Sequence, residues 1–163
     1  MLAFTYVHVL LSLVGIFSGL VVAGGFAAGK RFDGWTGLFL VTTAATSLSG
    51  YGFPFVTLLP SHVVGAISLA VLAVTVAARY AKHLVGWWRT VFVVGSVAAL
   101  WMNCFVLVAQ LFLRLPALQA LAPTGKEPIF GVTQLIVLGV FVAVGRAAMK
   151  GFRAGAEGLA RPA

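Results

Sequence analysis

The sequence predicts an all-α protein folded as a transmembrane helical bundle with five spans. Three observations support this fold class. Hydrophobic residues make up 61% of the 163 residues and charged residues only 9%, whereas a soluble domain carries about 25% charged residues. The charges lie between long apolar runs, and a helix needs a run of about 20 apolar residues to cross a bilayer. The length leaves no room for a soluble domain beside such a bundle.

The chain divides into five apolar runs, and at a rise of 1.5 Å per residue each approaches the thickness of the hydrocarbon core. We expect spans at residues 4–28, 35–56, 62–80, 90–113 and 128–148. Gly50, Pro54 and Pro60 separate the second run from the third, because proline removes a helix hydrogen-bond donor. Residues 1–150 are therefore expected to form one transmembrane domain, and residues 151–163 a basic cytoplasmic tail.

Lysine and arginine are distributed unequally between the two sides of this bundle. With the N-terminus outside, one side receives nine basic residues, and the other side receives only Arg114 and Lys126. The nine are Lys30, Arg31, Arg79, Lys82, Arg89, Arg146, Lys150, Arg153 and Arg161. The positive-inside rule then places the N-terminus outside and the C-terminus in the cytoplasm. Anionic lipid headgroups, and not nucleic acid, are the expected partners of the basic face.

The first run carries small residues at helical spacing. Gly15 and Gly19 form a GxxxG pattern, which Ser12 and Ala23 extend. Small residues at this spacing let helix backbones approach closely, so we expect this face to pack within the chain or against another copy. His8 falls on the same stripe and should therefore point into the bundle.

Uncharged polar residues gather in the half of the membrane that this topology makes external. They are His8, Tyr51, His62, Gln110 and Gln134, with Asn103 near the midplane. We expect these six residues to line a ligand pocket in the outer leaflet, which a short interfacial helix at 115–122 would cover. The simpler interpretation is that the amides only make hydrogen bonds between helices.

The two histidines leave alternatives open. His8 and His62 would lie at matching depth on different helices, as the axial ligands of a b-type haem do, and His8, Tyr51 and Gln134 could instead hold a quinone. Either cofactor would make the protein an electron-transfer component. A further alternative is a small channel or carrier for an uncharged solute. The sequence contains no metal-ligand spacing and no nucleophile motif, so we expect no catalytic residue, no metal and no enzymatic activity.

The last two runs carry a family resemblance. Residues 103–110 (NCFVLVAQ), followed by Leu115-Pro116, Ala122-Pro123-Thr124 and Gln134, resemble an uncharacterised family of small bacterial polytopic inner-membrane proteins. The resemblance implies the inner (cytoplasmic) membrane of a bacterium and supplies no activity or ligand. The function we expect is that of an accessory or interaction subunit, within either a homo-oligomer or a larger membrane complex.

Overall fold

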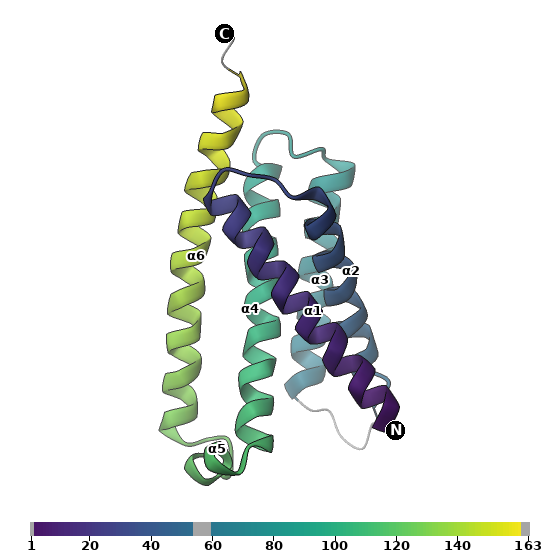
Figure 1. Cartoon of the computed structure of the whole chain (residues 1–163), viewed down its shortest axis with the longest axis vertical. Coiled ribbons are helices and arrows are strands. Elements are labelled where there is room, and N and C mark those ends of the chain that lie inside the picture. Colours follow the sequence, from purple (N-terminus) through teal and green to yellow (C-terminus); the bar gives the residue numbers. More distant parts are fainter. Residues whose placement is uncertain (1, 54–59, 161–163) are drawn as a thin grey trace.

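The computed structural model describes residues 2–53 and 60–160, and every regular element in them is helical. The elements are α1 (Leu2–Ala27), α2 (Asp33–Gly50), α3 (Pro60–Val76), the π-helical turn η1 (Ala77–Ala81), α4 (Trp88–Arg114), α5 (Pro116–Leu121) and α6 (Pro128–Ala160). The long helices form a bundle, α1 begins and α6 ends at opposite ends of it, and α5 lies at the turn between α4 and α6 (Figure 1). This confirms the predicted all-α fold class.

Four helical segments in the described residues are long and apolar enough to cross a membrane. They are α1, the continuous stretch His62–Ala81 of α3 and η1, α4, and Pro128–Arg153 of α6. The expectation of a multi-pass helical membrane protein is therefore supported. The second predicted span corresponds to α2, which falls outside this group. Threonine and serine occupy much of α2, and its buried side includes Thr42, Thr43, Thr46 and Ser47.

The helix ends agree with the predicted spans to within a few residues, with two exceptions. The second run was expected to continue to residue 56, but α2 ends at Gly50. The last helix continues far beyond residue 148, through the segment assigned to the tail, to Ala160. The turn expected between the second and third runs falls on residues 54–59, outside the described residues.

The extension of α6 is packed against α1. A side chain at Gly151 would collide with the backbone carbonyl oxygens of Phe26 and Ala27, so the missing side chain permits close approach. The next residue, Phe152, is 3% exposed. Its ring lies 5.1 Å from that of Phe26, which in turn lies 5.4 Å from that of Phe92. These three aromatic residues join α1, α4 and α6 at one end of the bundle.

The centre of the bundle depends on the small face of α1. An added Cβ at Gly19 would lie 2.6 Å from Leu100 Cδ1 and 2.8 Å from the ring of Phe39, so α2 and α4 both pack directly against this point. In contrast, many large apolar side chains of α1, α3 and α6 are exposed on the outside. A bundle that presents apolar side chains outward is suited to a lipid environment, where these side chains contact acyl chains.

Candidate functional site

His8 lies half-buried on α1, where it contacts the end of α2. Its Nδ1 atom is 2.8 Å from Ser49 Oγ, within hydrogen-bond distance. The ring of Phe53 packs edge-on against the imidazole at 5.2 Å. His8 therefore links α1 to the last turn of α2 and to the residues that follow it.

Tyr51 and His62 form a second contact at the same end of α2. The Tyr51 hydroxyl donates a 2.7 Å hydrogen bond to the backbone carbonyl of His62, and the two rings lie 5.7 Å apart. His62 is 7% exposed. The pair joins α2 to the first turn of α3, so Tyr51 acts as a connection between helices.

Asn103 is buried at the middle of α4. Its Nδ2 atom donates a 3.2 Å hydrogen bond to Thr43 Oγ1 of α2. Gly15 of α1 lies beside both groups, because a Cβ there would be 3.2 Å from Thr43 Oγ1 and 3.4 Å from Asn103 Nδ2. Three helices thus meet around one interhelical hydrogen bond.

The two glutamines lie on another side of the bundle. Gln134 of α6 donates a 3.0 Å hydrogen bond to the backbone carbonyl of Phe105 in α4. Gln110 is exposed and accepts a 3.3 Å hydrogen bond from Arg114 one turn later. Two buried atoms, Gln134 Oε1 and Trp101 Nε1, have no hydrogen-bond partner among the described residues. Trp101 also packs against Phe105.

The six residues predicted to line one pocket are thus divided among three places in the described contacts. His8, Tyr51 and His62 surround the end of α2, Asn103 bonds to the middle of α2, and the glutamines belong to α4 and α6. The helix α5 forms near the predicted position, but it packs beside α4 and buries none of its residues. Sequence spacing gives the depth and face of a residue, but it does not give the neighbouring helix.

Both histidine rings pack against aromatic rings at the end of α2. Each imidazole is covered by an aromatic ring of the same short segment, Phe53 on His8 and Tyr51 on His62. Among the side chains that the structure describes, those of residues 2–53 and 62–153, no group of three or more histidine, cysteine or carboxylate side chains is arranged to hold a metal ion.

Cationic side chains hold the opposite end of the bundle together. Arg79 of η1 forms an ion pair with Asp33 at 2.6 Å, and its guanidinium lies 5.4 Å from the centre of the Phe92 ring. Arg31 lies over the Phe152 ring at 4.7 Å. Lipid headgroups are the partners that the sequence predicts for these arginines, but in the structure both arginines also contact groups of the protein. In the sequence, the ion pair is indicated only by the presence of an arginine and an aspartate that are 46 residues apart.

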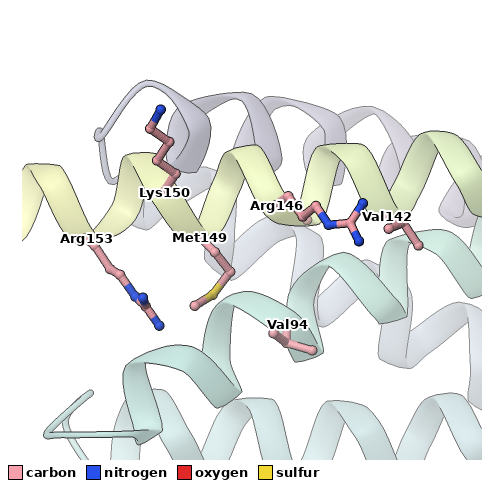
Figure 2. Close-up of a pocket in the computed structure, with 7 residues that line it drawn as sticks. Val94, Val142, Arg146, Met149, Lys150 and Arg153 are labelled. Carbon is pink, nitrogen blue, oxygen red and sulfur yellow. The ribbon is translucent and has the colours of Figure 1, made fainter.

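A groove also opens at this end, between α4 and α6. It has a volume of about 610 Å³. Val94 of α4 lines it together with Val142, Arg146, Met149, Lys150 and Arg153 of α6 (Figure 2). The sequence contains a signal for this feature, because Arg146, Lys150 and Arg153 have the spacing of one helix face. Without the position of α4, that spacing does not indicate a groove.

Comparison with protein-family models gives no match, and searches of curated proteins and of solved structures give none either. The class of this protein therefore rests on its own sequence and structure. It is a small helical protein with four apolar helices of membrane-spanning length among the described residues.

Proposed function

We propose that this chain is a non-enzymatic, five-span protein of the bacterial inner membrane that acts as an accessory or interaction subunit. The observation that carries the proposal is the outward face of α6. Gly139, Ala143 and Ala147 follow one another at four-residue spacing, and all three are exposed. An added Cβ at Gly139 would meet nothing within 4 Å. Membrane helices associate through small residues at this spacing, so the stripe fits a transmembrane helix of a partner.

The proposal treats α2 as the fifth span. Its 18 residues extend about 27 Å at 1.5 Å per residue, close to the thickness of the hydrocarbon core. Its threonines and serines face the bundle, whereas Leu38, Val41 and Leu48 are exposed. Apolar side chains on the outer face and polar side chains toward the bundle suit a helix that contacts lipid on one side and protein on the other.

The orientation follows from the basic end of the bundle. Lys30 and Arg31 follow α1, Arg89 begins α4, and Arg153 lies near the end of α6. The contact between Arg31 and Phe152 supports the placement of these segments at one common end. By the positive-inside rule this end lies in the cytoplasm and the N-terminus outside.

Site-specific photo-crosslinking in native membranes tests the interaction role. A diazirine amino acid at Ala143 should give an adduct with a protein, whose mass distinguishes a second copy from a different subunit. The same probe at Val41, which is 68% exposed on α2, should give lipid adducts only. Gly139→Leu should abolish the protein adduct without unfolding the chain, because there is open space around Gly139. Lipid adducts at both positions would contradict the proposal.

The orientation has its own test. In a Cys104→Ala background, Thr124→Cys should react with a membrane-impermeant maleimide added outside the cell. Ala156→Cys should react only after the cytoplasmic side is opened. The reverse labelling pattern would place the basic end outside and would overturn the proposed orientation. It would not affect the proposed contact between α6 and a partner, which the crosslinking experiment tests.

A further inference from the structure

The groove between α4 and α6 changes in character along its length. Val94 and Val142 form its apolar part, and Arg146 and Arg153 contribute cationic groups. Figure 2 shows Met149 and Arg153 reaching from α6 toward α4, whereas Lys150 points away from α4. The groove therefore combines an apolar part at Val94 and Val142 with cationic groups from α6, of which Arg153 points toward α4 (Figure 2).

The positions along α6 place this change at the boundary of the bilayer. Measured from Pro128 at 1.5 Å per residue, Val142 lies about 21 Å along the helix and Arg146 about 27 Å. Arg153 lies about 38 Å along it. A hydrocarbon core about 30 Å thick that begins at Pro128 would end between Arg146 and Arg153. In such a bilayer the apolar wall would face acyl chains and Arg153 would lie among headgroups.

A second hollow continues the groove toward the start of α4. It has a volume of about 240 Å³ and shares Met149 and Arg153 with the first, and Trp87 and Arg89 also line it. The Nε atom of Arg89 is buried and has no hydrogen-bond partner among the described residues. Trp87 is 67% exposed, as suits a side chain at the lipid–water interface. Arg89 and Arg153 thus face the same space from two helices.

We propose that this groove binds one anionic phospholipid, with its phosphate between Arg89 and Arg153 and an acyl chain along Val94 and Val142. Basic pockets between membrane helices suit anionic headgroups, and the apolar wall is a feature that a free phosphate would not need. Among the side chains of residues 2–53 and 62–153, the one ion pair joins Arg79 to Asp33. The site rests on the chain spanning a bilayer, as in the proposed function, and is independent of the small-residue stripe.

Native mass spectrometry of the full chain released from nanodiscs tests the site. With equal amounts of phosphatidylglycerol and phosphatidylcholine in the nanodisc, the protein should retain one phosphatidylglycerol. In the double variant Arg89→Gln/Arg153→Gln, the fraction of protein that retains phosphatidylglycerol should fall by about tenfold or more. Each arginine near the surface contributes attraction to the anionic lipid. The matched control, Arg114→Gln/Lys126→Gln, removes two charges at the opposite end and should retain the lipid as the wild type does.

Two further measurements separate the lipid from a phosphate ion and from general charge. Met149→Trp places bulk in the wall that both hollows share, so it should release the lipid with every arginine in place. Millimolar inorganic phosphate should leave the bound lipid unchanged. Equal retention of phosphatidylcholine, full retention by the double arginine variant or displacement by phosphate would each overturn the proposal. If the lipid is not retained but the probe at Ala143 still gives a protein adduct, the lipid site is refuted and the proposed interaction role is kept.

Discussion

Arg79 Nη2 donates a 2.6 Å hydrogen bond to Asp33 Oδ1 and thereby joins η1 to the first turn of α2. The arginine side chain is 13% exposed and the aspartate 77% exposed, so the pair lies partly in water. The aspartate also carries a negative charge at a helix N-terminus, where it is favourable. The ion pair therefore connects the start of α2 with η1, the turn that follows α3.

Asp33→Asn should weaken the bundle by at most about 1 kcal/mol, because exposed ion pairs contribute little and are screened by salt. Arg79→Ala should cost more, since it also removes the contact between the guanidinium and the Phe92 ring. Denaturant unfolding in detergent micelles measures both changes. Lys126→Gln at the opposite end is the control. An Asp33→Asn effect that persists unchanged at high salt would contradict an electrostatic origin.

Gly151→Ala should destabilise the contact between α1 and α6. The added methyl group collides with backbone carbonyls of Phe26 and Ala27, and backbone atoms give way less easily than a flexible side chain. Overpacking of this kind costs about 1–3 kcal/mol. The matched control is Gly139→Ala on the same helix, where the methyl group meets open space. Thermal unfolding of the two variants should separate clearly, and equal melting temperatures would show that α6 does not pack on α1 at residue 151.

The sequence predicts most of the helices because apolar length and proline position are local properties. It predicts less about the polar residues, because their hydrogen bonds depend on which helices are neighbours. Asn103 is buried, and its hydrogen-bond partner Thr43 lies 60 residues away in the chain. The sequence predicts that Gln134 and His8 line one pocket, but Gln134 bonds to α4 and His8 bonds to α2. The groove between α4 and α6 depends on a pair of helices whose contact no spacing rule predicts.

The hydrogen bond between Asn103 and Thr43 should contribute modestly to stability. Interhelical hydrogen bonds in membrane proteins average about 0.6 kcal/mol in double-mutant cycles. We expect a coupling of this size between Asn103→Ala and Thr43→Val, measured by unfolding in micelles. Gln110→Ala is the control, because Gln110 is exposed and bonds only within its own helix to Arg114. A coupling indistinguishable from zero would mean that the two side chains do not share a hydrogen bond in the folded protein.

The turn before α6 should open as the pH falls. Desolvation acts to raise the pKa of the Glu127 carboxyl, but hydrogen bonds from the Thr124 amide and hydroxyl and from the Lys126 amide lower that pKa below its usual value. A carboxyl whose pKa is lower in the folded state stabilises the fold above its unfolded pKa, and this contribution disappears as the pH falls through the folded pKa. Amide hydrogen exchange at Thr124 and Lys126, corrected for intrinsic rates, should therefore lose protection in acid, at pH values below the usual titration range of a glutamate carboxyl. Glu127→Gln should remove this pH dependence. Protection that stays constant in the wild type down to pH values well below that range would show that the carboxylate does not hold the turn.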